Sequence, residues 1–257
     1  MLRRTAKDPN LRVGSVARVR GVDEVRRGAE RLRVGAWRGD GSIAYVAPLT
    51  DRPPSAAMVR HACEILATRG YREVLTAALA ERERAGFLAA GFEVRDSLHL
   101  LAHDLSELPS RRHATLRRGR RRDRLAALAV DHQAFPAFWR LDESGFQEAI
   151  TATPSSRFRV ALVDRRIVGY AVTGRAGRRG YLQRLAVEPD MQGRGLGRAL
   201  VADSLDWLRR RGVTEAVVNT QVQNERALHL YLRMGFRLQP SGLEVLGRTI
   251  AEHQPIR

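Results

Sequence analysis

The stretch Gln192-Gly193-Arg194-Gly195-Leu196-Gly197-Arg198 decides the expected fold, because it lies between a predicted strand and a predicted helix. The strand is expected at 181–187, and apolar residues at helical spacing predict the helix at 196–210. A helix start leaves backbone N–H groups unpaired, and the helix dipole adds about half a positive charge there. Glycines let the backbone approach a ligand closely, so the loop is expected to cradle a diphosphate.

Two common phosphate-binding folds do not fit this loop. A dinucleotide-binding fold needs a strand directly before the glycines and an acidic residue about 20 positions later. Here Asp190-Met191-Gln192 intervenes, and the following strand carries Asn219 instead. A nucleoside triphosphate loop needs Gly-Lys followed by Ser or Thr, and this loop has no such sequence.

Hydrophobic patterns on both sides of the loop predict a mixed α/β order. Further strands are expected at 115–120, 158–163, 167–173 and 215–222, and further helices after Asp123 as N-cap, at 142–150 and at 225–234. The short turn Asp164-Arg165-Arg166 predicts a hairpin. Gly235 is the expected stop of the last helix.

Comparison of the chain with itself predicts a duplicated unit. The corresponding segments are 53–70 with 195–212, Ala80 with Asn224, Phe87 with Tyr231, and Gly91-Phe92 with Gly235-Phe236. In the first copy prolines replace the glycines, and the side chains that could do chemistry are missing. We interpret the first copy as degenerate.

A proline among polar residues at 107–112 predicts a boundary between two lobes. The expected division is a degenerate N-terminal lobe at 1–106, a linker at 107–112, a catalytic lobe at 113–250 and a tail at 251–257. The N-terminal lobe looks truncated before a strand at 42–49.

Three segments together resemble the GCN5-related N-acetyltransferase (GNAT) family. They are Leu185-Ala186-Val187-Glu188-Pro189, the loop 192–198, and 224–231 followed by Gly235-Phe236. The resemblance covers roughly residues 114–248. It implies a mixed α/β fold of two lobes, each a mostly antiparallel twisted sheet with flanking helices and a splayed strand pair for coenzyme A. The tandem arrangement with one silent copy resembles that of actinobacterial mycothiol synthases.

The resemblance implies acetyl-CoA as the cofactor and an amine as the acceptor. The implied cofactor-binding residues are Leu185, Ala186, Val187, Gln192, Gly193, Arg194, Gly195, Leu196, Gly197, Arg198, Asn224 and Tyr231. Tyr231 follows Asn224 by two helical turns, so both share one face, and its hydroxyl would protonate the leaving thiolate. Two alternatives stay open: Tyr231 as a core aromatic, and Asn224 as a helix N-cap.

The expected catalytic residues are Tyr231, Asn219 and Glu188. In related ribosomal-protein alanine acetyltransferases a glutamate base stands where this chain has Asn219, which takes no proton at neutral pH. Glu188 is the nearest acidic candidate, although it could simply end its strand. Deprotonating a lysine amine at pH 7 costs about 4.6 kcal/mol, but an α-amine only about 1.4 kcal/mol. The hypothesis is therefore a low-pKa acceptor amine, deprotonated through water held by Asn219 and Gln221.

The acceptor pocket is expected near Asp142, Glu143, Phe138 and Trp139, although Phe135, Phe138 and Trp139 could equally be core aromatics. An alternative function is a regulatory protein that binds acyl-CoA without turnover. The intact Tyr231 argues against that alternative, and the missing carboxylate base argues for it.

The net charge of +17 raises the alternative of nucleic-acid binding through residues 117–124. Lys7 is the only lysine among 45 basic residues, however, which is the composition that a GC-rich genome encodes. Nucleic acid is therefore not the expected main partner. No apolar run approaches the ~20 residues of a membrane span, and Cys63 is the only cysteine. A cytoplasmic protein without a metal is expected.

Overall fold

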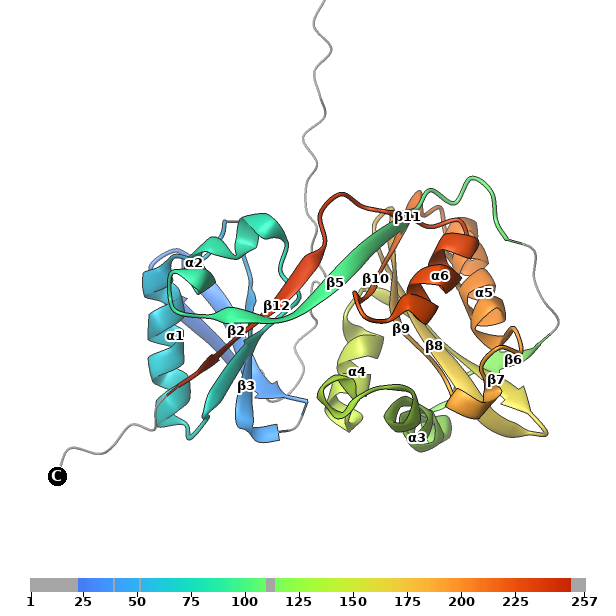
Figure 1. The fold of residues 1–257 in the computed structure, drawn as a ribbon, viewed down its shortest axis with the longest axis horizontal. Coiled ribbons are helices and arrows are strands. Elements are labelled where there is room, and N and C mark those ends of the chain that lie inside the picture. Colours follow the sequence, from blue (N-terminus) through green and yellow to red (C-terminus); the bar gives the residue numbers. More distant parts are fainter. Residues whose placement is uncertain (1–22, 39, 51, 110–113, 251–257) are drawn as a thin grey trace, which may run out of the picture.

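The computed structural model describes residues 23–38, 40–50, 52–109 and 114–250. Two lobes share one mixed sheet of 12 strands (Figure 1). The first part of the chain forms β1 (Asp23–Arg27), β2 (Glu30–Trp37), β3 (Asp40–Pro48), α1 (Ala56–Thr68), β4 (Glu73–Thr76), η1 (Glu81–Glu83), α2 (Ala85–Leu88) and β5 (Glu93–His103). The predicted N-terminal residues 1–22, part of the predicted linker and the tail 251–257 lie outside the described residues.

The second part of the chain contains the glycine loop. Its elements are β6 (Thr115–Arg118), η2 (Arg121–Asp123), α3 (Arg124–Ala134), η3 (Ala137–Trp139), α4 (Glu143–Thr151), β7 (Ser155–Val163), β8 (Arg166–Ala176), β9 (Arg179–Val187), η4 (Pro189–Met191), α5 (Leu196–Arg210), β10 (Glu215–Gln221), α6 (Glu225–Arg233), β11 (Arg237–Leu238) and β12 (Leu243–Thr249). The predicted helix at 196–210 is confirmed at both ends, and the predicted hairpin joins β7 and β8.

The strand order is β1-β2-β3-β4-β12-β5-β10-β9-β8-β7-β6, with β11 paired to β5. Only β3–β4 and β9–β10 are parallel pairs among these, and the other pairs are antiparallel. The predicted mixed α/β fold of two mostly antiparallel lobes is confirmed. Within the described residues, the splayed strand pair expected in each lobe is absent from the N-terminal one, because β3 and β4 pair up to Val46 and Thr76, the last residue of β4.

The two lobes exchange strands at their junction. Strand β12, from the end of the described chain, pairs with β4 of the N-terminal lobe, and β5 pairs with β10 of the C-terminal lobe. Figure 1 shows β5 and β12 running together between the lobes. Because strands on both sides of residues 107–112 cross over, the proposed linear division of the chain stays a proposal.

The hydrogen bonds after the helices support the duplication. Phe92 N donates to Phe87 O over 3.1 Å, and Phe236 N donates to Tyr231 O over 3.0 Å. The glycines between them, Gly91 and Gly235, both have positive φ. The same backbone motif therefore ends the corresponding helix in each lobe.

The expectation that the N-terminal lobe is truncated before residue 42 is wrong. The hairpin of β1 and β2 precedes β3, and Leu32 and Val34 on β2 are fully buried. Arginines at alternate positions of β2 hide this strand in the sequence, although Arg33 is itself buried.

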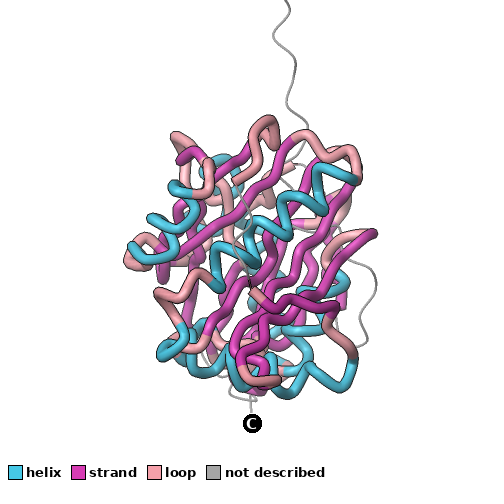
Figure 2. The backbone as a smooth tube through the Cα atoms, turned by 90° about the vertical axis from the view of Figure 1, so that its right-hand side faces the viewer, coloured by secondary structure: helices cyan, strands magenta, loops and turns pink. Residues whose placement is uncertain are grey.

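Helices cover both faces of the C-terminal part of the sheet. Ala171 packs with the α5 side chains, whereas its neighbour Tyr170 packs with α3 and α4. Adjacent residues of a strand point to opposite faces, so α5 and the α3–α4 pair lie on opposite sides. In Figure 2, which looks onto the C-terminal lobe, a helix crosses the strands diagonally. The sheet edge between these layers is where the predicted site lies.

Asp123 is the N-cap residue of α3, as predicted, but its side chain makes no cap hydrogen bond to that helix. The Asp123 carboxylate instead accepts hydrogen bonds from Arg117 Nη1 (2.6 Å), Arg117 Nη2 (2.9 Å) and Arg120 N (2.7 Å). A guanidinium offers a carboxylate two parallel charge-assisted bonds, which are stronger than one bond to a backbone amide. Asp142 does cap the next helix, because its Oδ1 accepts from Gly145 N at 2.7 Å.

Candidate active site

The strands β9 and β10 separate after a short stretch of pairing. Their parallel ladder joins Arg179–Tyr181 to Glu215–Val217. Strand β9 continues to Val187 while paired along its other edge with β8, and β10 continues to Gln221. A gap bounded by two strands therefore opens beyond Tyr181 and Val217.

Backbone groups of β9 line this gap. Glu188 N donates to Val168 O at 2.9 Å, on the β8 side. Because backbone direction alternates along a strand, the N–H and C=O groups of Leu185 and Val187 point to the opposite side, into the gap. A β-bulge precedes them, since Val172 pairs with Arg184 and Thr173 with Leu182, which leaves Gln183 as the extra residue. Such a bulge bends the strand and increases its local twist.

The glycine loop follows β9 and opens α5. Gly193 and Gly195 have φ of +78° and +82°, a region that favours glycine. The bond from Ala199 N to Gly195 O begins the helix, so the N–H groups of residues 196–198 have no acceptor within it. The Arg198 Nε is buried without a hydrogen-bond partner. Unpaired donors and a cation at a helix N-terminus form an anion site.

Gln192 braces this loop from within. Its Nε2 donates to Val187 O at 3.0 Å, and its Oε1 accepts from Arg226 on α6. The Gln192 side chain thus orders the turn that contains the glycines. These two bonds tie the loop to both β9 and α6.

Helix α6 carries the predicted Asn224 and Tyr231. Asn224 Oδ1 accepts from Ala227 N at 3.1 Å, so Asn224 is the N-cap of the helix. Tyr231 is 5% exposed and packs against Phe236, with ring centroids 5.6 Å apart. Within the described residues its hydroxyl makes no hydrogen bond. Burial raises the pKa of Tyr231, and the charge of Arg184 opposes this rise.

Asn219 lies on the other wall of the gap. It is exposed, whereas Val217 on the same face of β10 is buried against Tyr181 and Trp139. Its cross-strand neighbour is Leu100 of β5, a strand shared with the N-terminal lobe. The predicted alternation of Val217, Asn219 and Gln221 on one face agrees with this burial pattern.

Glu188 is held in an ion pair. Its side chain is 9% exposed, and both carboxylate oxygens accept from Arg166 Nη1, at 2.5 and 2.6 Å. The pair links the end of β9 to the start of β8 next to the glycine loop. The ion pair gives Glu188 a structural role, and its predicted role as a general base stays a prediction.

A buried charge cluster that the sequence did not indicate lies beside the bulge. Asp131 is fully buried and accepts from Arg184 Nε (2.7 Å), Arg184 Nη2 (2.8 Å), Tyr170 Oη (2.5 Å) and Leu141 N (2.9 Å). The Arg184 guanidinium lies over the Phe135 ring, 3.5 Å from its centroid. An arginine inside an otherwise apolar strand is the one sequence signal that could have revealed this cluster.

The predicted acceptor aromatics have different roles. Trp139 packs with Tyr181 and Val217, the residues at the start of the gap, and its Nε1 donates to Asp96 Oδ2 at 2.7 Å. Phe138 contacts Trp37 of the N-terminal lobe, and Phe135 stacks on Arg184. Of the three, Trp139 is therefore the one that lines the Asn219 side of the gap.

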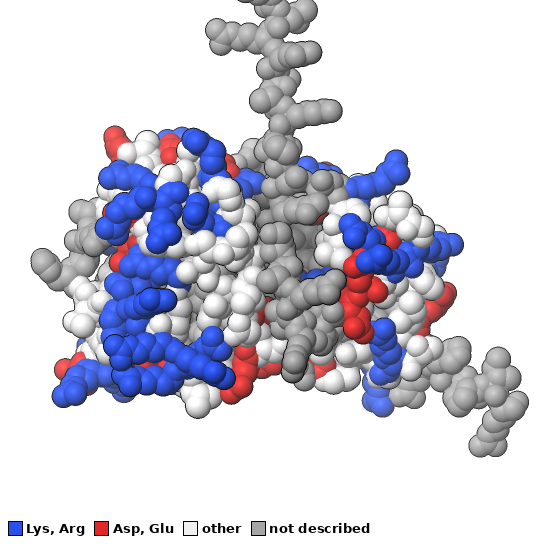
Figure 3. Space-filling view, turned by 180° about the vertical axis from the view of Figure 1, so that it is seen from behind, with Lys and Arg blue, Asp and Glu red and all other residues white. Residues whose placement is uncertain are grey.

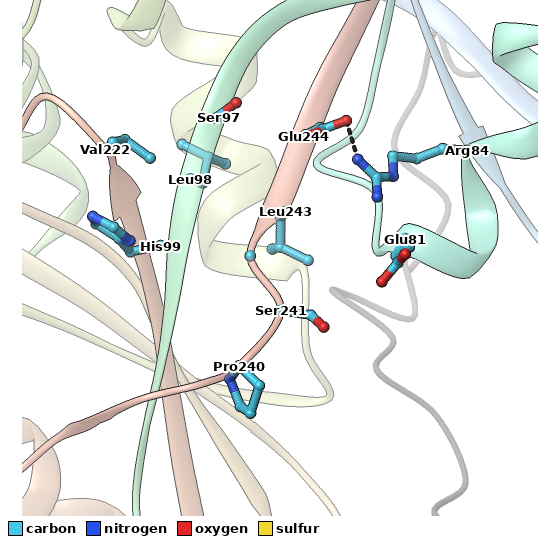
Figure 4. Close-up of a pocket in the computed structure, with 11 residues that line it drawn as sticks. Glu81, Arg84, Ser97, Leu98, His99, Val222, Pro240, Ser241, Leu243 and Glu244 are labelled. Carbon is cyan, nitrogen blue, oxygen red and sulfur yellow. Dashed lines mark ion pairs between the residues drawn. The ribbon is translucent and has the colours of Figure 1, made fainter.

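A pocket of about 340 Å³ lies between the lobes on this side (Figure 4). Its apolar walls are Leu98, Val222, Pro240 and Leu243, and its polar groups are Glu81, Ser97, His99, Ser241 and the Arg84–Glu244 ion pair. Leu98 pairs with Gln221, two residues from Asn219. The pocket thus adjoins the Asn219 wall of the gap, and both lobes build it.

Residues 125–236 match the acetyltransferase (GNAT) family. This region is a GNAT domain. The tandem GNAT protein from the clavulanic acid biosynthesis pathway has a similar fold, with a TM-score of 0.66 at 14% identity over 87% of this chain and 81% of that chain.

Two curated relatives match the GNAT domain over shorter segments. The N-alpha-acetyltransferase 30 of Schizosaccharomyces pombe is 41% identical over 58 residues, which is 23% of this chain and 39% of that protein. The mycothiol acetyltransferase of Rhodococcus jostii is 48% identical over 52 residues, 20% of this chain and 17% of that protein. The matched segments thus span less than half the length of either relative.

Metal-binding clusters and membrane-spanning helices are both absent from the part of the chain that the structure describes. It holds no group of three or more His, Cys, Asp or Glu side chains placed to bind a metal ion. Nor does it contain a helix long and apolar enough to cross a membrane. Basic side chains gather over the C-terminal lobe in Figure 3, and Arg118, Arg120, Arg121 and Arg122 are exposed.

Proposed function

We propose that the GNAT domain transfers an acetyl group from acetyl-CoA to a primary amine by direct attack on the thioester. The observation that carries this proposal is the gap between β9 and β10, with the α5 N-terminus at one end and Tyr231 beside it. Strand-like backbone groups, an anion site and a buried hydroxyl are the three features that coenzyme A binding and thioester cleavage require.

The residues present fit the cofactor. The N–H groups of residues 196–198 and the Arg194 and Arg198 side chains would hold the diphosphate. The N–H and C=O of Leu185 and the N–H of Val187 would pair with the pantetheine amides as a strand partner does, whereas Val187 O already accepts from Gln192 Nε2. Asn224, the N-cap of α6, follows the end of β10. Acetyl-CoA supplies the activated acyl carbon that the amine attacks.

The chain's own groups would then assist the transfer. A backbone N–H beside the Gln183 bulge would donate to the acyl oxygen as that oxygen gains negative charge. The Tyr231 hydroxyl would donate its proton to the departing sulfur. Its raised pKa keeps it protonated at neutral pH, which is the state that a proton donor needs.

We propose a low-pKa amine as the acceptor, bound in the pocket of Figure 4. The exposed polar residue on the pocket side of the gap is Asn219, and Glu188 is neutralised by Arg166. With an amide rather than a carboxylate at position 219, water held by Asn219 and Gln221 would take the proton, and the cost of that step is small only for amines with a pKa near 8. An N-alpha-acetyltransferase among the relatives supports an α-amine, and the mycothiol acetyltransferase supports a small molecule. We also propose a cytoplasmic location, because a single cysteine allows no disulfide within the chain.

A panel of amines with graded pKa tests this function. Release of free coenzyme A should be fastest with α-amines and amino sugars and slowest with lysine side chains. Asn219→Glu should narrow that difference by supplying a carboxylate base, and the pH profile of kcat/KM should then gain a limb near 5 to 6.

A regulatory acyl-CoA-binding protein is the second candidate, favoured by the amide of Asn219 at the position where the resemblance implies a glutamate base. The same panel separates the two. Tight binding of acetyl-CoA without release of coenzyme A to any acceptor would favour the regulatory protein.

A further inference from the structure

Three consecutive carbonyls at η3 are each held by an arginine. Arg38 Nη1 donates to Phe138 O at 3.0 Å and to Arg140 O at 3.1 Å. Between them, Arg184 Nη2 donates to Trp139 O at 2.6 Å. One arginine comes from strand β9 at the gap, and the other comes from the N-terminal lobe.

The backbone conformation of Arg38 and two neighbouring tryptophan rings hold its side chain in this contact. It lies in the turn between β2 and β3 with φ of +49°, an uncommon conformation for a residue with a side chain. Its guanidinium carbon lies 4.6 Å from the Trp37 ring centroid and 5.1 Å from the Trp139 ring centroid. A planar cation over two indole rings gains cation–π attraction from each of them.

The charge of Arg38 persists at neutral pH. Burial, with the nearby Arg184 guanidinium as the second cause, lowers its pKa to about 10. Asp131, Asp142 and Glu148 act in the opposite direction. The side chain therefore remains a cation that can donate to both carbonyls.

The contact between Arg38 and the 137–140 turn involves Trp139, which lies next to the β9–β10 gap. Trp139 is held by its carbonyl on Arg184, by its ring face on Arg38 and by its Nε1 on Asp96. Its ring packs with Tyr181 and Val217, where the β9–β10 gap begins. Arg184 also acts electrostatically on Tyr231. The position of Arg38 therefore influences where the Trp139 ring lies at the start of the β9–β10 gap.

We propose that Arg38 is a positioning residue through which the degenerate N-terminal lobe holds the 137–140 turn, and with it Trp139 at the start of the β9–β10 gap that adjoins the acceptor pocket. The inference rests on the proposed acetyl transfer for its kinetic consequence. Its structural consequence, a turn ordered by Arg38, stands without it.

A separate contact between the lobes provides a control. Arg33 Nη2 donates to Glu148 Oε1 at 3.1 Å, on α4 and away from the turn. Glu148→Gln weakens the attachment of the lobes without removing a donor or an acceptor of the three carbonyl bonds, although it also removes a charge that acts on Arg38. Arg31→Met removes one positive charge from the same strand β2, where Arg31 is exposed and 3.6 Å from Glu24.

The kinetic test compares these variants on the full chain. Arg38→Met should raise the KM for the acceptor amine about tenfold or more, because the turn loses both of its hydrogen bonds from Arg38. The Kd for acetyl-CoA should stay within about twofold. Arg38→Lys, which keeps a cation with several donors but loses the planar stacking, should recover part of the acceptor KM. Arg31→Met and Glu148→Gln should leave that KM unchanged.

Hydrogen exchange measured by mass spectrometry tests the positioning without turnover. Amides of residues 135–142 should exchange at least tenfold faster in Arg38→Met, and at the wild-type rate in Glu148→Gln and Arg31→Met. Unchanged exchange in folded Arg38→Met, or an equal acceleration in Glu148→Gln, would overturn the proposal. Faster exchange in a chain that acetylates no amine would sink the proposed function and leave the positioning role in place.

Discussion

Tyr181 and Val217 form the last residue pair of the parallel ladder between β9 and β10. Beyond this pair β9 has one paired edge and one open edge, with the glycine loop and α5 directly following. The Tyr231 ring is buried in the core that α5 and α6 share. The arrangement brings an open strand edge, an anion site and a hydroxyl to one place, and each makes a separate prediction.

Replacing Tyr231 by Phe removes only the hydroxyl, which has no hydrogen bond within the described residues. We expect kcat to fall by ~10²-fold or more, because a positioned proton donor contributes about that much. The Kd for acetyl-CoA and the melting temperature at pH 7 should change little. A kcat within twofold of the wild type would contradict the role and make Tyr231 a core aromatic.

The raised pKa of Tyr231 also has a stability consequence. An unfolded tyrosine loses its proton near pH 10, whereas burial keeps Tyr231 protonated at higher pH in the folded chain. Its contribution is therefore present below pH 10 and is lost as the pH rises above it. Denaturation at pH 8 and pH 11 should show a smaller alkaline loss of stability in Tyr231→Phe than in the wild type.

The conformation of Gly193 gives a test of the anion site. Alanine at this position meets no heavy atom within 4 Å, but its φ of +78° strains any residue with a Cβ by ~1–2 kcal/mol. We expect Gly193→Ala to weaken acetyl-CoA binding by about fivefold to thirtyfold as the loop leaves its cradle shape. Titration calorimetry measures this Kd.

Gly177 provides the matched control. It lies in the β8–β9 turn with φ of +57° and equally free surroundings, remote from the loop. Gly177→Ala should lose similar stability and bind acetyl-CoA like the wild type. Equal weakening in both variants would mean that backbone strain acts through global stability, not through the cradle.

Sequence patterns predicted those parts of the site whose structure depends on neighbouring residues in the chain. Helix α5 begins and ends at the predicted residues because its apolar face is regular and its glycines stand at its start. Gly235 ends α6 with φ of +89°, as expected for a helix stop. These features depend on residues within a few positions of each other.

The remainder depends on residues far apart in the chain. The pairing of β12 with β4 joins positions about 170 residues apart, and no local pattern specifies it. Arg38 hydrogen-bonds to Phe138, 100 residues away in the sequence, and Arg184 hydrogen-bonds to Asp131, 53 residues away. Charged residues that are buried in pairs look the same in sequence as exposed ones, so the inter-lobe turn and the buried cluster were not predicted.

The Asp123–Arg117 pair predicts how stability depends on acid. The Arg117 hydrogen bonds, as the largest cause, lower the pKa of Asp123 from 3.8 to about 2. A carboxyl whose folded pKa is lowered stabilises above its unfolded pKa, and this stabilisation is lost as pH falls from about 4 to about 2. Asp123→Asn should therefore reduce stability by about 1 kcal/mol at pH 7, with the difference vanishing near pH 2. Asp164→Asn, in an exposed turn, is the control and should melt like the wild type at both pH values.

The N-terminus of α1 already holds the carboxylate of Glu30, so we predict that one chain binds one acetyl-CoA. Ser55, which corresponds to Gly197, donates through its N–H to Glu30 Oε1 at 2.5 Å and through Oγ to Glu30 Oε2 at 2.8 Å. The backbone hydrogen bond from Ser55 is the largest cause that lowers the pKa of Glu30, so the carboxylate is anionic at neutral pH. The chain's own anion therefore occupies the position that the diphosphate would take.

The rest of that lobe is closed to the cofactor in the same way. Pro53 and Pro54 stand at the positions of Gly195 and Leu196 and offer no N–H. Strands β3 and β4 stay paired up to Val46 and Thr76, the last residue of β4. Titration calorimetry should give one site per chain, and Glu30→Gln should still give one, because the prolines and the closed strand pair remain. Gly193→Ala should weaken that single site without revealing another. Two sites of similar affinity, or a strong site that survives Gly193→Ala and disappears in Glu30→Gln, would place cofactor binding in the N-terminal lobe and refute the prediction.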